Sequence, residues 1–193
     1  MQHHDVNPSA RPAIAPVDAI DVIDFWVVAG HALWFAKNTE FDRRFRERFL
    51  PLHEAAARGE LGYWLRSASG SLALLLLLNQ FPRNAFRGTP RMYETDALAR
   101  EIAHQAIEAR HDTKVPEDLR PFFYLPFGHS EHLADQERCV LFSRRLGQPH
   151  LAHAERHRDI VRRFGRFPHR NPILGRATSQ HEQQFLDSGG FGG

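Results

Sequence analysis

The sequence lacks most of the features that assign a chemistry by themselves. It contains one cysteine, Cys139, which excludes an internal disulfide and any multi-cysteine metal or redox motif and fits a reducing cytoplasm. The longest apolar run, LALLLLL at residues 72–78, is far shorter than the roughly 18 residues that cross a membrane. A glycine-rich phosphate loop, a nucleophile elbow and a dinucleotide fingerprint are also missing. We therefore expect a cytoplasmic protein without a cofactor.

Length and composition indicate one ordinary globular domain. The 193 residues are 42% hydrophobic and 25% charged, which is typical of folded chains. The net charge of +2 is too small to indicate a nucleic-acid or membrane partner, although 23 Arg stand against 2 Lys. Asp5 and three prolines near the start argue against a secretory signal peptide. We expect a flexible lead-in at 1–16, a single helical domain at 17–187 and a flexible Gly-rich tail at 188–193.

Hydrophobic periodicity predicts an all-α fold. Apolar residues recur at helical spacing, and no stretch alternates as a strand does. Prolines predict a kink or split at Pro51 and helix ends at Pro82 and Pro126. Seven to eight helices in antiparallel pairs favour a tetratricopeptide-like superhelix or an irregular bundle. The expected helices lie at about 17–29, 39–59, 69–81, 95–109, 116–124, 130–147, 149–164 and 179–186.

One polar motif occurs twice, each time after a predicted helix. Residues 81–84 read FPRN, and residues 167–171 read FPHRN. In a structural role, each Arg neutralises carbonyl groups at a helix C-terminus and each Asn closes a turn. In a functional role, Arg83, Arg166 and Arg170 line one pocket, because guanidinium groups match the geometry of carboxylate or phosphate. The sequence leaves both roles open.

A second polar segment, residues 127–138, reads FGHSEHLADQER. If a helix begins at Ser130, His129 stands just outside its N-terminus, where the positive end of the helix dipole favours a neutral imidazole. His153 and His157, four residues apart on a later helix, have a spacing at which two imidazoles can share a metal ion. A partly buried His157 bonded to a carbonyl explains the same pattern, so we predict no metal site.

Four groups of residues together form a recognisable series. They are Trp34, Phe35, Lys37, Phe41 and Asp42; residues 72–84; Pro126, Phe127, His129, Ser130, Glu131 and Gln136; and His157 and Arg158 with residues 164–171. From about residue 20 to residue 186, the chain resembles the bacterial "domain of unknown function 924" family. The resemblance implies an all-helical fold similar to tetratricopeptide-like superhelices in a cytoplasmic bacterial protein, and it supplies no established reaction. Asn79 stands where the family pattern has Asp, so a role of that Asp as a base is not available here.

The sequence is compatible with two functions. In the first, polar side chains of the motifs converge in a cleft that binds a small anionic molecule, with His129 or His157 as general base, oriented by Glu131. Arg83 and Arg170 would act as electrophilic clamps. The further ligand-binding candidates are Asn84, Gln136, Arg138, Arg166, His169 and Asn171. In the second, these groups form a structural network in a non-catalytic adaptor that binds a protein or peptide.

Overall fold

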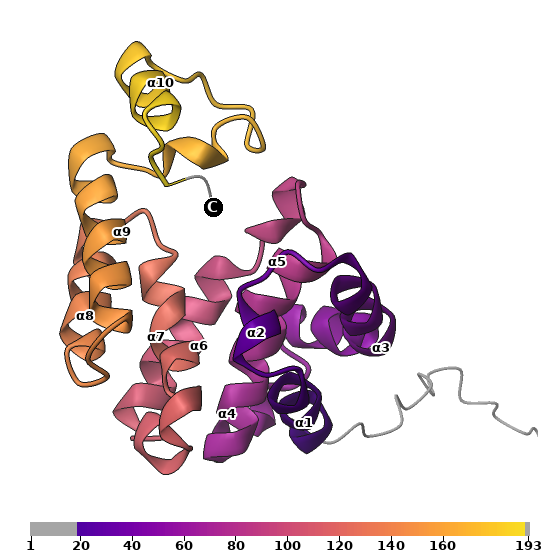
Figure 1. The fold of residues 1–193 in the computed structure, drawn as a ribbon. Coiled ribbons are helices and arrows are strands. Elements are labelled where there is room, and N and C mark those ends of the chain that lie inside the picture. The colour runs from indigo at the N-terminus through magenta and orange to yellow at the C-terminus, as the bar shows by residue number, and fades with distance from the viewer. Residues whose placement is uncertain (1–18, 192–193) are drawn as a thin grey trace, which may run out of the picture.

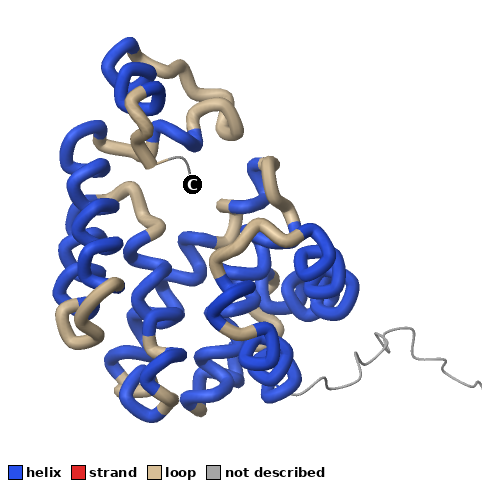
Figure 2. The backbone as a smooth tube through the Cα atoms, viewed as in Figure 1, coloured by secondary structure: helices blue, strands red, loops and turns tan. Residues whose placement is uncertain are grey.

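The computed structural model describes residues 19–191, and every regular element in that range is helical (Figure 1, Figure 2). The all-helical prediction is confirmed, whereas the predicted lead-in at 1–16 lies outside the described residues. Within 19–191, no helix has both the length and the apolar character needed to cross a bilayer. The α-helices are α1 (Ala19–Ala29), α2 (His31–Trp34), α3 (Thr39–Ala57), α4 (Ala68–Leu75), α5 (Phe81–Ala85), α6 (Asp96–Glu108), α7 (Pro121–Gly128), α8 (Leu133–Ser143), α9 (His150–Phe164) and α10 (Gln180–Asp187). The 3-10 helices are η1 (Gly62–Arg66), η3 (Pro90–Met92), η4 (Asp112–Lys114), η5 (Glu117–Leu119) and η6 (Pro168–Arg170), and η2 (Leu76–Gln80) is a π-helix.

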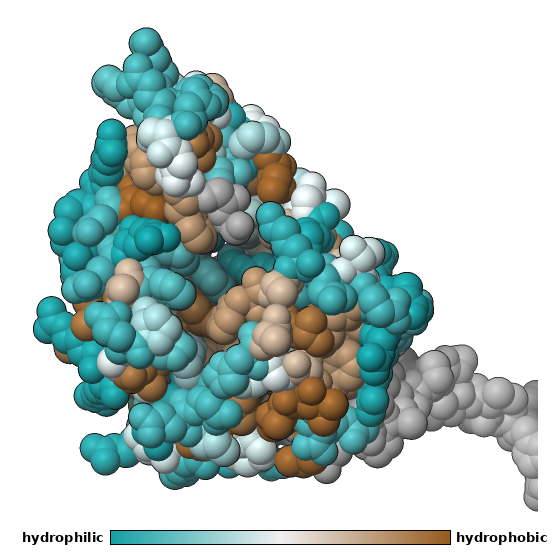
Figure 3. Space-filling model, viewed as in Figure 1, coloured by the Kyte–Doolittle hydropathy of each residue, from teal (hydrophilic) through white to brown (hydrophobic). Residues whose placement is uncertain are grey.

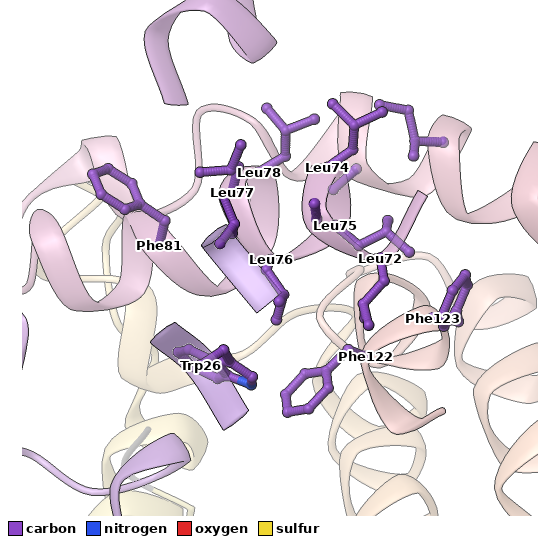
Figure 4. Close-up of a cluster of buried hydrophobic side chains, with 14 of the residues drawn as sticks. Trp26, Leu72, Leu74, Leu75, Leu76, Leu77, Leu78, Phe81, Phe122 and Phe123 are labelled. Carbon is purple, nitrogen blue, oxygen red and sulfur yellow. The ribbon is translucent and has the colours of Figure 1, made fainter. Parts of the chain in front are cut away.

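The apolar run at residues 72–78 forms the centre of the core, as the sequence predicts. Its leucines are each 1% exposed or less. Figure 4 shows Trp26 of α1 and Phe122 of α7 facing these leucines. Each buried leucine contributes about 1.5 to 3 kcal/mol relative to an exposed one. This burial fixes the position of the polar residues that follow the run.

The helical course does not end at Pro82, which corrects the prediction. α4 passes through the π turn η2 directly into α5, which has Pro82 in its first turn. A proline has no N–H for the carbonyl four residues earlier, here that of Leu78. Oγ1 of Thr95 donates to that carbonyl instead, at 2.6 Å. The π turn thereby carries the fully buried Asn79 to the end of the central helix.

Other predicted helix ends are also wrong. Pro126, at which a helix end was predicted, lies inside α7, which continues to Gly128. Pro51 lies inside α3 and does not split it, and the alternative of a kink there stays a prediction. A proline inside a helix costs about 3 kcal/mol or more, but α7 buries nearly all of its side chains and offsets that cost. α8 begins three residues later than expected, because Oγ of Ser130 accepts a hydrogen bond from the N–H of His132 in a turn before the helix.

The C-terminal segment, residues 165–191, lies across a gap from the N-terminal helices. In Figure 1, α7, α8 and α9 lie side by side, and the chain after α9 faces α5 and η3 from the opposite side. Figure 3 shows a hollow in the same region of the same view, with a floor of hydrophilic residues. The finer prediction of a tetratricopeptide-like superhelix stays a prediction.

Candidate functional site

A buried ion pair lies where the π turn ends. Arg83 donates to both carboxylate oxygens of Asp96, at 2.8 and 2.9 Å, and to the carbonyl of Asn79 at 2.7 Å. The side chains of Arg83 and Asp96 are only 16% and 10% exposed. Asp96 lies in the first turn of α6, where the helix dipole favours a carboxylate. Arg83, predicted as an anion clamp, therefore already holds a carboxylate of the protein.

Asn79 orients His129. Nδ2 of Asn79 donates to Oδ1 of Asp96 at 3.0 Å, and this fixes the amide orientation because a carboxylate only accepts hydrogen bonds. Oδ1 of Asn79 consequently faces Nδ1 of His129 at 2.8 Å. Nδ1 must then carry the hydrogen, which leaves a lone pair on Nε2 of the neutral imidazole.

His157 has the same tautomer for a different reason. Its Nδ1 lies 3.0 Å from the carbonyl oxygen of Gly128. Because a carbonyl can only accept, Nδ1 donates and Nε2 keeps a lone pair. Burial lowers the pKa of His157 to about 4. The bond ties α9 to the end of α7, next to His129, and matches the carbonyl-bonded histidine expected from the sequence.

Arg170 is a buried cation without a carboxylate partner among the described residues. It is 7% exposed, and its Cζ lies 4.7 Å from the ring centroid of Tyr93 and 4.4 Å from that of Phe167. Among residues 19–191, its buried Nε has no hydrogen-bond partner, and its guanidinium forms no ion pair. Burial and the charge of Arg83 lower its pKa to about 10, which still leaves it charged at neutral pH. The rings of Tyr93 and Phe167 lie against its guanidinium group, whose N–H donors form no hydrogen bond with a described residue.

His169 and Phe191 extend the aromatic wall beside Arg170. The ring centroids of His157 and His169 lie 5.3 and 5.6 Å from that of Phe167. Phe191, from the Gly-rich end of the chain, lies 4.7 and 5.1 Å from the same two histidines. Nδ1 of His169 is buried without a hydrogen-bond partner in the described part of the chain, and burial lowers the pKa of His169 to about 4.

Ring contacts bring segments that are far apart in sequence together: Arg83 and Arg170 both lie over the ring of Tyr93, and Arg170 and His157 both lie against the ring of Phe167. Burial, followed by the charges of Arg83 and Arg170, holds the pKa of His129 well below its usual 6.5. Arg170 lowers the pKa of the two other histidines as well. Five of the predicted side chains, Arg83, His129, His157, His169 and Arg170, interact with one another electrostatically, while the predicted cleft that gathers all the motif residues and its binding role stay predictions. The group that we call the Arg170 site comprises Arg83, Tyr93, His129, His157, Phe167, His169 and Arg170.

Glu131 braces the C-terminal segment and does not orient a histidine. Its carboxylate accepts from Arg176 at 2.6 and 3.0 Å and from the backbone N–H of Phe167 at 2.8 Å. Burial alone would raise the pKa of Glu131, but the bonds from Arg176 and Phe167 outweigh burial and hold the pKa below its usual 4.5. The predicted role of Glu131 as the partner of a histidine is therefore wrong, because its oxygens are already used.

Three further candidates have structural contacts around the site. Nδ2 of Asn84 donates to Asp42 at 2.7 Å, and Oδ1 of Asn171 accepts from Arg176 at 3.0 Å. Nε2 of Gln136 donates to backbone carbonyls at the end of α7. These bonds tie loops to helix ends, which is the structural role that the sequence left open.

Arg138 and Arg166 are not part of the Arg170 site. Arg138 is exposed on α8, and no described contact joins it to the site. Arg166 donates to Glu182 at 2.6 and 2.8 Å, and this pair lines a separate surface hollow of about 610 Å³. The predicted participation of both arginines in one anion pocket is therefore not found.

Sequence reasoning missed two residues that shape the site, Tyr93 and Asp96. Asp96 carried a weak signal, since an acidic residue opens the predicted helix at 95–109. Tyr93 carried none, because a single aromatic residue in a loop has no period or motif. Both become visible only when α6 is packed against η2 and α5.

The structure shows how the metal-ligating side chain types are placed, including the pair His153 and His157. In the described range 19–191, no three His, Cys, Asp or Glu side chains are placed to share a metal ion. His153 is exposed, while the Nδ1 of His157 is bonded to Gly128. The pair His153 and His157 thus has no third ligand beside it among the described residues.

Comparison with known proteins gives a family and a related structure. A family model described as a bacterial protein of unknown function (DUF924) matches residues 22–190. The solved structure of a protein of unknown function, ATU0120 from Agrobacterium tumefaciens, is 56% identical with a TM-score of 0.87. The match covers 88% of this chain and 97% of that one. No curated protein matches the chain.

Proposed function

The chain belongs to the DUF924 family of bacterial proteins, and from this premise we propose that it binds a small anionic molecule, a phosphate or a carboxylate, at the Arg170 site. One observation carries the proposal. The side chain of Arg170 is buried, with 7% of its surface exposed, yet its Nε has no hydrogen-bond partner in the described chain. A ligand with oxygen atoms could accept hydrogen bonds from the guanidinium N–H groups of Arg170, which no described residue accepts.

The energetics favour an anion in this place. An unpaired buried charge costs several kcal/mol, and an unsatisfied hydrogen bond to a charged group costs about 1 to 3 kcal/mol or more. Arg83 does not relieve this cost, because it is itself positive and bound to Asp96. The stacking of Arg170 on Tyr93 and Phe167 holds the guanidinium plane in place. A pre-positioned guanidinium fork loses little entropy when it binds an anion.

His129 and His157 supply the basic atoms at this site. Both keep a lone pair on Nε2, since their Nδ1 atoms donate to Asn79 and Gly128. Burial, and after it the surrounding positive charge, lowers the pKa of both imidazoles and makes them weak bases. A bound anion offsets that charge and raises their pKa toward neutrality, where a general base works best. The cytoplasmic location expected from the sequence belongs to this proposal, and the buried free Cys139 fits it.

The test is thermal unfolding in the presence of inorganic phosphate or malate. At a ligand concentration of 100 times Kd, binding adds about 2.7 kcal/mol, which corresponds to a rise in Tm of about 5 to 10 °C for a chain of this size. We expect this rise in the wild type and in Arg138→Met, which removes an exposed arginine, but not in Arg170→Met. An equal rise in Arg170→Met would contradict the proposal. A flat response of all three proteins would also contradict it and leave the adaptor function as the remaining prediction.

A further inference from the structure

We propose that the Arg170 site selects oxyanions that bring their own hydroxyl hydrogen, such as hydrogen phosphate or a 2-hydroxycarboxylate. This inference rests on the proposed function and narrows it from anions in general to one chemical class. Its starting point is the two imidazoles beside Arg170, which have fixed tautomers. An oxyanion without a hydroxyl group has only acceptor atoms to offer them.

The Nε2 atoms of His129 and His157 are hydrogen-bond acceptors. In each ring Nδ1 must donate, in one case to the amide oxygen of Asn79 and in the other to the carbonyl of Gly128. Neither Nε2 is bonded to a described residue, and neither is fully enclosed. An O–H group can donate to these atoms, whereas a bare anionic oxygen is repelled by their lone pairs.

The side-chain amide of Asn79 cannot flip by about 180° to present its NH₂ group to Nδ1 of His129. Its Nδ2 donates to the carboxylate of Asp96 at 3.0 Å, and its Oδ1 accepts from Nε2 of Gln80 at 3.0 Å. A reversed amide would place oxygen against the Asp96 carboxylate and an NH₂ group against the NH₂ group of Gln80. The acceptor character of His129 is thus set by a buried network and not by the ring alone.

Burial, and after it cationic groups from three elements, keeps these imidazoles neutral. Protonation of either ring would add charge to a site that already holds two guanidinium groups, and little of the site reaches water. Acidic groups nearby act mainly on other residues, since Asp96 is bonded to Arg83 and Glu131 to Arg176. The groups acting on His129 and His157 are Arg83 of α5, His153 and Arg156 of α9, and His169 and Arg170 of η6, together with the mutual effect of the two histidines.

The Arg170 site therefore requires two kinds of hydrogen-bonding group from a ligand, an acceptor and a donor. Arg170 supplies N–H donors that require anionic oxygens, and His129 and His157 supply lone pairs that require a donor. Hydrogen phosphate and sulfate have the same tetrahedral shape and charge, but only hydrogen phosphate carries an O–H group. Malate and succinate differ in the same way. A site built to bond a hydroxyl group rejects an analogue that lacks it, because its polar atoms stay unpaired.

The experiment is calorimetric titration of the wild type with these two matched pairs at about pH 8, where inorganic phosphate keeps one proton. We expect hydrogen phosphate or malate, or both, to bind about tenfold or more tightly than its partner without the hydroxyl group. Preference for phosphate alone or for malate alone identifies the source of the hydroxyl group. Equal affinity within both pairs would overturn the inference while leaving the proposed function intact, whereas no binding of any of the four would overturn the proposed function itself.

Proton uptake gives a second readout. Sulfate can be bonded by His129 or His157 only when that imidazole is protonated, so its affinity should rise as the pH falls, by up to about tenfold for each pH unit, with up to one proton taken up. Hydrogen phosphate should bind near pH 8 with little uptake, as measured in two buffers of different ionisation heat. In His157→Gln, whose amide can donate, the preference for phosphate over sulfate should shrink. A sulfate affinity that does not change with pH would contradict the inference.

Discussion

The guanidinium carbon of Arg170 lies 4.7 Å from the ring centroid of Tyr93. Arg170 comes from η6, near the C-terminal end of the chain, and Tyr93 directly follows η3, so the contact joins the two sides of the gap seen in Figure 1. Arg83 lies over the same ring at 5.8 Å. One tyrosine thus contacts both an arginine that is paired with a carboxylate and an arginine that has no such partner among the described residues.

This difference between the two arginines predicts opposite effects of the same substitution. Arg83→Met leaves the buried Asp96 carboxylate without its partner and should lower the free energy of unfolding by about 3 to 5 kcal/mol. Arg170→Met removes an unpaired buried charge and keeps the apolar stem, so it should leave stability unchanged or raise it in anion-free buffer. Urea denaturation of both variants and the wild type measures this. A comparable loss in both would mean that Arg170 has a protein partner.

Asn79→Asp should raise the pKa of His129. The substitution replaces a neutral amide by a carboxylate at hydrogen-bond distance from Nδ1, and an adjacent negative charge stabilises the imidazolium. It also sets two carboxylates side by side, since Nδ2 of Asn79 lies 3.0 Å from Asp96, so some stability should be lost. NMR titration of the imidazole C–H resonances measures the pKa. His111, whose Nδ1 lies 2.8 Å from Oγ of Ser71 near the start of α4, is the internal control and should not change.

Folding stability should fall between about pH 7 and pH 5. The pKa values of His157 and His169 are about 4 in the folded protein and about 6.5 in an unfolded chain. The folded state therefore binds fewer protons, so its stability is complete above about pH 6.5 and is lost as the pH falls toward 4. For His157 alone the loss is about 2 kcal/mol between pH 7 and pH 5. Chemical denaturation at both pH values tests this, and His157→Gln should reduce the difference.

Glu131→Gln should loosen the C-terminal segment without unfolding the protein. The carboxylate of Glu131 holds Arg176 and the backbone N–H of Phe167, and a neutral amide holds both more weakly. Hydrogen exchange of the Phe167 amide should accelerate, while amides in the central helix stay protected. Glu137→Gln is the matched control, because the exposed pair of Glu137 with Arg162 contributes at most about 1 kcal/mol. Unchanged exchange at Phe167 would contradict the bracing role.

The fold class and the central helix were predictable from the sequence. The run at residues 72–78 is apolar all round, which is typical of a helix enclosed by other helices. The helix end predicted at Pro82 was wrong because the local rule for proline ignores Thr95, whose hydroxyl takes over the freed carbonyl of Leu78. A rule that considers one residue type at a time does not include hydrogen-bond partners that are distant in sequence.

The site was predictable only in part, for a similar reason. The repeated motif marked Arg83 and Arg170 by residue type, but residue type does not tell which arginine has a carboxylate beside it. Asp96 and Tyr93 decide that question, and both reach the site only through the packing of α6 and the loop before it. Glu131 was assigned to the wrong partner because Arg176 lies 45 residues away.

Anion binding at Arg170 can be observed in a crystal structure of the protein grown with inorganic phosphate. We expect a phosphate beside Arg170, with oxygen atoms about 2.7 to 3.2 Å from its guanidinium nitrogens. A structure in which those nitrogens donate to oxygen atoms of the protein, with no phosphate beside them, would contradict the proposed function.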